Sequence, residues 1–398
     1  MLTKEQNELI CHVGPGTPGG EFLRRYWQAI AFSIDVTPGG KPKAITIMGE
    51  ELVLFRDEDG RPGLLGLRCS HRLTSLAYGR VEDGGLRCPF HGWVYDVEGR
   101  CLEQPAEPLG STFKDRIRHP SYPCQDLGGL IFAYMGPLEL MPLLPRYEVL
   151  VREDGERDYC YYWSDGNYLQ HLEGAVDTAH FAYLHQDRWS QVKHRLAKLP
   201  KPEIEIGETE YGHWHKSVLP HVRFDNVLTV FTHFFMPAGF MLVRGNFEDG
   251  GRTGLKKRQS WYTPIDDTRT LRLEVGFAPE GQGARPGVPP GEARAGEEWT
   301  DPKPLDYYRD YENVDTIHGI PMSQFRSQDI MVNESQGPIV DRSREHLGAQ
   351  DHIVTVMRKL MFDGIGDVQA GRDPKHVIRD PAQNEIVYLR GADQLEYV

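Results

Sequence analysis

The chain has 398 residues, of which 39% are hydrophobic and 10% aromatic, so it is long enough for two packed domains. A formal net charge of −13 offers no basic face of the kind that nucleic-acid binding requires, and no apolar run is long enough to span a bilayer. The first residues lack the apolar core of a signal peptide, and six cysteines are too few for a disulfide framework. We therefore expect a protein of the reducing cytoplasm that binds neither nucleic acid nor membrane.

The first part of the chain is expected to change from helix to strand. Residues 1–30 are predicted to be helical, with Thr3 and Gln6 in the spacing of a capping box and a glycine-rich interruption before residue 20. From about Lys43 to Tyr134, short apolar runs alternate with Gly, Asp and Pro turns, which is typical of a small all-β unit. These runs are residues 44–48, 52–55, 63–67, 86–87, 93–96 and 130–134.

The second part is expected to combine helices with a large sheet. Residues 137–145 are predicted to be a linker, 164–185 a helix, 279–304 a Pro/Gly-rich loop, and both 306–332 and 343–362 helices. Between them, six long strands predict an antiparallel sheet, so the fold class is α+β. These strands are residues 203–206, 213–219, 227–235, 239–245, 257–263 and 270–276.

Two Cys/His pairs lie in the predicted β region. One is Cys69 with His71 and the other is Cys88 with His91, with sixteen residues between the pairs. Two thiolates and two imidazoles suit either one tetrahedral zinc ion or a Rieske-type [2Fe-2S] cluster. Zinc sites usually pair like with like, whereas each loop here supplies one Cys and one His, so the pattern favours the cluster and leaves zinc as the alternative. The other cysteines are scattered and expected to be inert: Cys11, Cys101, Cys124 and Cys160.

A second set of candidate ligands lies on the predicted helix 164–185. On a helical wheel Asp177 falls between His180 and His185, so it is placed to orient a histidine from outside the coordination sphere. The histidines are five residues apart and diverge by about 140° on an ideal helix, so they share one ion only if the helix bulges. Two histidines and one carboxylate form the facial triad of non-haem Fe(II) oxygenases. Asp329 and Glu334 are the carboxylates downstream that could complete it.

Several segments resemble one enzyme family. The motifs CSHR and CPFHGW look like the Rieske motif of aromatic ring-hydroxylating oxygenases. The segments RRYW, NYLQHLEGAVDTAHFAYLH and QDIMVNESQGPIVDRSREHLG are similar to the phthalate dioxygenase branch, which includes aromatic carboxylate dioxygenases and aryl-ether O-demethylases. The resemblance implies that Cys69 and Cys88 bind one iron of the cluster and that His71 and His91 bind the other.

The same resemblance implies the second site. His180 and His185 would bind a mononuclear Fe(II), and Asp329 is chosen as third ligand because its segment resembles the family's QDxxxxE stretch. Asp177 would bridge His180 to His91 of the partner subunit in a head-to-tail homotrimer or a hexamer of two trimers. One departure is Leu73, where the family often has a small residue, so the cluster potential or the contact with the donor is expected to differ.

The implied organisation has three parts: an N-terminal helical segment packed on the catalytic domain (1–42), a Rieske [2Fe-2S] domain (43–140) and a helix-grip catalytic domain with the mononuclear iron (141–398). The implied function is the oxygenase component of a multicomponent system. Electrons from NAD(P)H arrive through a ferredoxin or flavin reductase, and O2 is used to hydroxylate an aromatic, carboxylated substrate.

Two other functions stay open at this point. One is an O- or N-demethylating monooxygenase acting on a methoxy-aromatic substrate. The other is a non-catalytic protein with zinc or a cluster, which would need neither the second ligand set nor a further domain of roughly 250 residues.

Four more residue roles are expected from the sequence. Asn167 either hydrogen-bonds near the iron or is a buried structural side chain. Arg223 and Arg244 are candidates for binding a substrate carboxylate, with an ordinary ion pair as the alternative for each. The pocket is expected between the strands after residue 210 and the helix 306–332. Histidines on or beside these strands are not expected to be ligands: His213, His215, His221 and His233.

Overall fold

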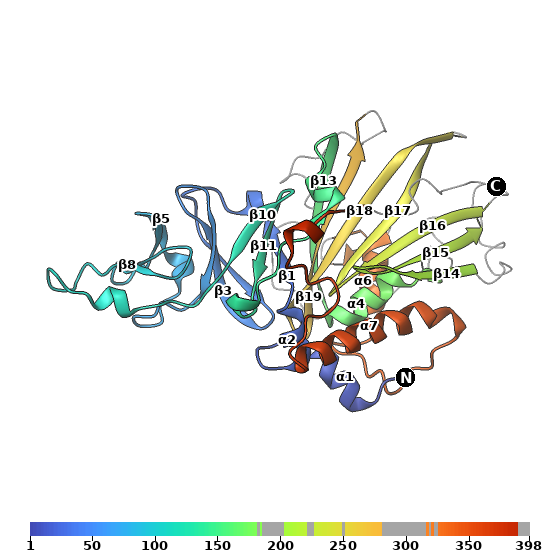
Figure 1. Ribbon diagram of the computed structural model, residues 1–398, viewed down its shortest axis with the longest axis horizontal. Coiled ribbons are helices and arrows are strands. Elements are labelled where there is room, and N and C mark those ends of the chain that lie inside the picture. Colours follow the sequence, from blue (N-terminus) through green and yellow to red (C-terminus); the bar gives the residue numbers. More distant parts are fainter. Residues whose placement is uncertain are drawn as a thin grey trace.

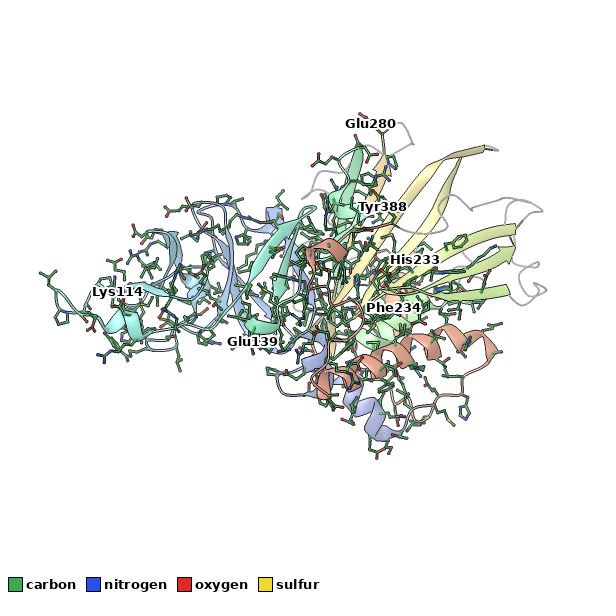
Figure 2. All side chains as sticks on the ribbon, in the orientation of Figure 1. Lys114, Glu139, His233, Phe234, Glu280 and Tyr388 are labelled. Carbon is green, nitrogen blue, oxygen red and sulfur yellow. The ribbon has the colours of Figure 1, made fainter. Side chains whose placement is uncertain are left out.

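The structure is a computed structural model that describes residues 1–180, 184, 203–220, 227–248, 251–280, 316–317, 320–321 and 325–388. The molecule is elongated: small antiparallel sheets form one end, and a large sheet with helices along it forms the other (Figure 1). Lys114 lies near the small-sheet end (Figure 2). This arrangement confirms the α+β class that the sequence predicts.

The large sheet has seven antiparallel strands in the spatial order β13-β19-β18-β17-β16-β15-β14. Because side chains alternate between the two faces, the register decides which residues share a face. Tyr162 pairs with Arg272, and Arg272 pairs with Tyr262, so these three lie in one row on one face. The strands are β13 (Gly155–Asp165), β14 (Glu203–Glu208), β15 (Gly212–Pro220), β16 (Val227–Phe235), β17 (Gly239–Glu248), β18 (Gly251–Asp266) and β19 (Arg269–Pro279).

Helices cover one face of this sheet (Figure 1). Phe234 and Phe240 of the sheet share a buried core with Leu169, Leu172 and Met361 of the helices. No helix among the described residues is long and apolar enough to cross a membrane. The helices are α1 (Lys4–Cys11), α2 (Pro18–Leu23), α3 (Glu148–Val151), α4 (Tyr168–Val176), α6 (Phe325–Glu334) and α7 (His352–Gln369).

The other face packs against the β-rich first part of the chain. Trp27 and Phe132, from strands before residue 135, share a second core with Phe235, Trp261 and other residues of the large sheet. His233 and Phe234 are labelled in Figure 2, and their side chains take opposite faces of β16. His233 hydrogen-bonds to Tyr211 Oη at 2.8 Å, on the side away from the helices. The large sheet is therefore buried on both faces.

Three small sheets build the rest of the first part. Phe55 and Leu65 of one small sheet share a buried core with Leu86 and Tyr95 of another. Asp83 and Gly84, both with positive φ (58° and 76°), make the tight turn of one hairpin. The sheets are β1 (Trp27–Phe32) with β11 (Leu130–Tyr134) and β10 (Cys124–Leu127); β2 (Lys43–Ile47), β3 (Glu50–Arg56), β4 (Pro62–Gly66) and β9 (Ser121–Tyr122); and β5 (Arg80–Glu82), β6 (Gly85–Arg87), β7 (Val94–Tyr95) and β8 (Cys101–Glu103).

Two short strand pairs complete the described structure. Strand β12 (Arg146–Tyr147) is parallel to β22 (Ile386–Val387), which ties the segment after the small sheets to the C-terminal part. Strands β20 (Thr316–Ile317) and β21 (Ile320–Pro321) are antiparallel and precede α6.

Strands agree with the sequence prediction better than helices do. All six strands expected between residues 203 and 277 are present, and Thr3 caps α1 with Gln6 as predicted. The helix predicted over 1–30 is wrong at its end, because residues 27–32 are the fully buried strand β1. The helix predicted over 306–332 is wrong at residues 316–317 and 320–321, which form strands, and α6 begins at Phe325. The helix predicted over 343–362 begins at His352 and runs to Gln369.

The prediction of one helix over 164–185 is also wrong. Ser164 and Asp165 end β13, and Gly166 follows with φ of 110°, a conformation that favours glycine. Helix α4 then ends at Val176, because Asp177 is extended. The helical-wheel argument for Asp177, His180 and His185 therefore does not apply.

A buried ion-pair network fixes α4 in place. Arg342 has no exposed surface and donates to Glu173 of α4 from Nη2 at 2.9 Å and from Nε at 3.0 Å. Its Nη1 donates to Asn7 of α1 at 3.1 Å, and Arg358 of α7 donates to Glu173 at 2.6 Å. A buried charge without its partner is costly, so these contacts hold α1, α4 and α7 in one relative position.

Candidate metal centres

The two Cys/His pairs lie on two loops of matching construction. Leu73 N–H donates to Cys69 C=O at 2.9 Å, and Gly92 N–H donates to Cys88 C=O at 3.1 Å. Both donors have positive φ, 60° for Leu73 and 74° for Gly92. Each loop thus closes on a left-handed residue four positions after its cysteine. Glycine adopts this conformation freely, whereas in Leu73 it is strained, so the departure predicted from the sequence is a backbone feature as well.

The loops bring the four candidate ligands together. The rings of His71 and His91 have centroids 4.4 Å apart at an interplanar angle of 72°. Cys69 and Cys88 are 1% and 2% exposed, whereas His71 is exposed and His91 half-buried. The thiols therefore lie on the protein side of the site and the imidazoles on the solvent side.

The donor set fits a two-iron cluster. Burial raises the pKa of Cys88, and Cys69 beside it raises that pKa further, so two free thiolates are disfavoured unless a cation takes up their charge. Burial and the nearby His71 and Arg72 lower the pKa of His91, which keeps its ring neutral as a ligand must be. Within the described ranges, no three His, Cys, Asp or Glu side chains are arranged to hold one metal ion. The buried thiols on one side and the imidazoles on the solvent side suit two ligand pairs on separate irons.

Other side chains support this site. The Trp93 ring stacks on His71 with centroids 4.6 Å apart. Ser70 hydrogen-bonds to His119 Nδ1 at 2.8 Å, and the opposite nitrogen of His119 donates to Gly66 C=O at 2.7 Å. Tyr95 Oη lies 3.3 Å from Cys69 Sγ. Burial is the main cause that raises the pKa of Tyr95, so its hydroxyl stays protonated as a donor.

The second centre lies where α4 meets α6. His180 Nδ1 lies 3.3 Å from Asp177 Oδ2, and His180 Nε2 lies 3.6 Å from Asp329 Oδ1. Asp177 also accepts backbone N–H groups from Ala179 at 2.8 Å and from His180 at 3.2 Å, which fixes the turn after α4. Asp177 therefore holds one ring nitrogen of His180 and leaves the other directed at Asp329.

Electrostatics agree with this geometry. Burial would raise the pKa of Asp177, but the hydrogen bond from His180 and the backbone donors lower it overall. Burial would lower the pKa of His180, but Asp177 and Asp329 raise it overall. The two carboxylates beside His180 make this position favourable for a cation, which fits a divalent metal ion.

Glu334 and Asn167 make contacts that stabilise the fold around the second centre. Glu334 accepts the backbone N–H of Asp165 at 2.8 Å, so of the two downstream carboxylates only Asp329 faces His180. Asn167 caps α4 and donates to Cys11 C=O at 2.8 Å and Asp267 C=O at 2.7 Å. These are the contacts of a structural residue, and that is the role we propose for Asn167. Outside the described part fall His185, Arg223, His221 and the side chain of Arg244.

A buried charged group on the helix-facing side of the large sheet was not identified from the sequence. Glu274 is 3% exposed and contacts Arg272 of its own strand, Arg258 of β18 and Arg326 of α6. The alternation Arg272-Leu273-Glu274 in a strand with apolar neighbours was the available signal, since it puts two charges on a face that a helix covers.

Comparisons with known proteins identify the family. Residues 26–119 match the Rieske [2Fe-2S] domain, and residues 303–385 match the family described as LigXa C-terminal domain like. The chain is 33% identical to the 5,5'-dehydrodivanillate O-demethylase oxygenase subunit of Sphingobium sp. (strain NBRC 103272 / SYK-6), over 98% of this chain and 86% of that one. It is 34% identical to the phenoxybenzoate dioxygenase subunit alpha of Ectopseudomonas oleovorans, over 92% and 87%.

A solved structure supports the fold. Dicamba monooxygenase bound to dicamba aligns with a TM-score of 0.66 at 18% identity, over 88% of this chain and 100% of that one. The chain therefore belongs to the Rieske-type oxygenases, as an oxygenase (alpha) subunit of the phthalate dioxygenase-like branch. Enzymes of this class carry a [2Fe-2S] cluster and a mononuclear iron, and both candidate centres suit those groups.

Tyr95→Phe is expected to lower the reduction potential of the cluster. A hydrogen bond to a thiolate stabilises the more negative reduced state, and its loss is worth roughly 20 to 65 mV for one electron. A redox titration followed by EPR measures this shift, with Tyr78→Phe as an exposed control on the same end of the molecule. An unchanged potential in Tyr95→Phe would show that the hydroxyl does not act on the cluster.

Glu334→Gln is expected to stabilise the protein at alkaline pH. Burial raises the pKa of Glu334 from 4.5 to about 9, so the folded protein keeps a proton that the unfolded chain loses. The contribution of protonated Glu334 to the free energy of unfolding is fully present below pH 4.5. It is lost as pH rises towards 9, at about 1.4 kcal/mol per pH unit. Glutamine mimics the protonated acid and is free of this loss.

Thermal unfolding between pH 5 and 8.5 tests this expectation. The melting temperature of Glu334→Gln minus that of the wild type should grow with pH. The exposed control Glu139→Gln should show no such trend. A difference for Glu334→Gln that is constant over this range would mean that Glu334 is ionised in the folded protein.

Proposed function

We propose that this oxygenase subunit oxidises a small aromatic substrate, with hydroxylation of an aromatic carboxylate as the first candidate reaction. The observation that carries the proposal is the position of His180 between Asp177 and Asp329. A histidine and a carboxylate that can bind one metal ion, His180 and Asp329, meet there, and Asp177 orients the histidine ring. When bound, the cluster supplies single electrons and the mononuclear iron activates O2. A ferredoxin or flavin reductase is the proposed electron donor, NAD(P)H the source, and the cytoplasm the compartment.

Each residue of the second centre has a proposed task. His180 offers Nε2 to the metal, because Asp177 holds Nδ1 and so fixes the tautomer and the plane of the ring. Asp329 offers its carboxylate from the middle of α6. His185, which lies outside the described residues, is the proposed third ligand. Cys69, His71, Cys88 and His91 hold the cluster.

O-demethylation is the second candidate reaction. The support for it is the 33% identity with the dehydrodivanillate O-demethylase subunit over 98% of this chain. Both reactions use the same pair of centres, so the product depends on which atom of the substrate faces the metal.

The active unit is proposed to span two subunits of a homotrimer or hexamer. In one chain the strands β5 and β8 lie near one end of the molecule, and α4 and α6 lie beside the large sheet in the other half (Figure 1). His71 is exposed, and Leu73 and Phe90 beside it are 69% and 54% exposed, which suits a surface that a second copy covers. We place Asp177 opposite His91 of the partner subunit at that contact.

Activity with a reconstituted reductase tests the reaction. The wild type, NADH and reductase should convert at least one member of a panel of benzoates and methoxybenzoates, with products separated by mass spectrometry. His180→Ala and Asp329→Asn should lose iron and at least roughly 100-fold activity while keeping the cluster spectrum, and Asp177→Asn should lose roughly 10- to 100-fold. Glu334→Gln serves as the matched carboxylate control. Full activity in Asp329→Asn would contradict the proposed ligand set.

Complementation tests the assembly. Cys88→Ser removes the cluster and Asp329→Asn removes the mononuclear iron, so each variant alone should be inactive. Co-expressed with different tags and isolated as mixed oligomers, they should regain activity, because an intact cluster loop in one chain then faces an intact Asp177 and His180 in the next. Mixed oligomers as inactive as the single variants would contradict a site shared between subunits.

A further inference from the structure

Three arginines surround one buried glutamate on the helix-facing side of the large sheet. Glu274 lies 2.6 Å from Arg272 Nη2, 3.1 Å from Arg258 Nη1 and 3.6 Å from Arg326 Nη2. Arg258 also pairs with Asp158 at 2.7 Å. The described side chains of this group therefore carry three positive and two negative charges, which leaves one positive charge in surplus.

Arg272 has an unused donor. Its Nη2 forms an ion pair with Glu274 and donates to Ser260 Oγ at 3.1 Å, but its buried Nε has no hydrogen-bond partner among the described residues. The guanidinium lies over the rings of Tyr162 and Tyr262, at 5.3 Å and 4.9 Å from their centroids. Two ring faces, one ion pair and one hydrogen bond fix its plane, so the Nε–H points in one set direction.

Tyr262 supplies a second unused donor beside the first. It is directly opposite Arg272 in the register of β18 and β19 and is only 3% exposed. Its hydroxyl has no hydrogen-bond partner in the part of the chain that the structure describes. Burial raises the pKa of Tyr262, so the group stays a neutral donor. A buried hydroxyl without an acceptor is unfavourable and is satisfied when a ligand supplies one.

The residues that follow the proposed iron ligand Asp329 on α6, Ile330 and Met331, share a buried cluster with Tyr162 of this group. Asp329 acts electrostatically on Arg272 and on Tyr262. Arg326 also lies over the ring of Tyr162, 5.2 Å from its centroid. It precedes Asp329 by three residues on α6. If Asp329 binds a metal ion, its charge is balanced there, and the surplus charge of the arginine group is left for another anion.

We propose that Arg272 and Tyr262 form an anion-binding subsite that receives the carboxylate of an aromatic substrate. This inference rests on the proposed function and names the residues that read the acid group of its substrate. Arg272 Nε–H and Tyr262 O–H donate to the carboxylate, while Glu274 keeps the guanidinium in place. The ring of the substrate is then directed towards His180 and Asp329. Arg272 and Tyr262 act as specificity-determining residues.

Calorimetric binding to the loaded, oxidised protein without reductase tests the subsite. The probes are 4-methoxybenzoate and the neutral 4-methoxybenzamide. The wild type should bind the benzoate at least roughly 10-fold more tightly. Arg272→Gln should weaken the benzoate by roughly 10- to 100-fold and Tyr262→Phe by roughly 2- to 10-fold, with little change for the benzamide.

Two further variants serve as a matched control and as a substitute for Arg272→Gln. Arg269→Gln, on the same strand but paired with Asp266 at 2.7 Å outside the group, should bind both probes as the wild type does. If Arg272→Gln does not fold, Arg272→Lys keeps a charge beside Glu274 but lacks the Nε donor, and it should still lose the preference. The visible cluster spectrum and the melting temperature report folding.

A benzoate preference that survives in folded Arg272→Gln or Arg272→Lys would overturn the subsite. So would a wild type that binds the two probes equally or binds neither. These results would leave the oxygenase proposal standing, since that proposal is tested by product formation and by the metal content of the His180 and Asp329 variants.

Discussion

The placement of His180 between two carboxylates is the constraint on which the second centre depends. Helix α4 must end at Val176 for Asp177 to turn back on His180, and α6 must lie beside it for Asp329 to reach the other ring nitrogen. Buried polar contacts hold both helices at the required position. Asn167 caps the start of α4, the ion pair of Arg342 with Glu173 anchors its middle, and Glu334 ties the end of α6 to the end of β13. Since each of these groups is buried, a shift of either helix would leave polar atoms unpaired, so the fold itself fixes His180 relative to Asp329.

Local patterns in the sequence indicate the candidate ligands but not the geometry that unites them. Strand alternation and the Thr3 capping box are local signals, and both are present in the structure. Residues 164–185 have the composition of a continuous helix. The structure shows that Asn167 caps the start of α4 and that the extended Asp177, which accepts the backbone N–H of Ala179, ends it. Asp329 and Glu334 are equivalent in a sequence, and their roles differ because α6 turns one towards His180 and the other towards Asp165. The group around Glu274 was missed because its members come from β18, β19 and α6, so its charge balance depends on the register of the sheet.

The two centres follow opposite designs. At the small-sheet end, the thiols are buried while His71 is exposed beside the large apolar residues Leu73 and Phe90. In the other half, His180, Asp329 and the arginine group lie between the large sheet and its helices, with only part of their surface open. An exposed electron-transfer loop and a covered reaction site suit contact between subunits, because the first must meet a protein partner and the second must exclude bulk water from its substrate. The strained left-handed conformation of Leu73 lies at the rim of the exposed loop, where such a contact would bear on it.

The most direct test of the account is the metal content of the whole chain purified without oxygen, together with EPR of the reduced protein. Two centres of the proposed kinds predict about three irons and two acid-labile sulfides per chain, and a Rieske-type EPR signal on reduction. Asp329→Asn should then lose about one iron per chain and keep the sulfide and that signal. Zinc in place of iron, with no acid-labile sulfide in protein kept anaerobic throughout, would contradict the account at both centres.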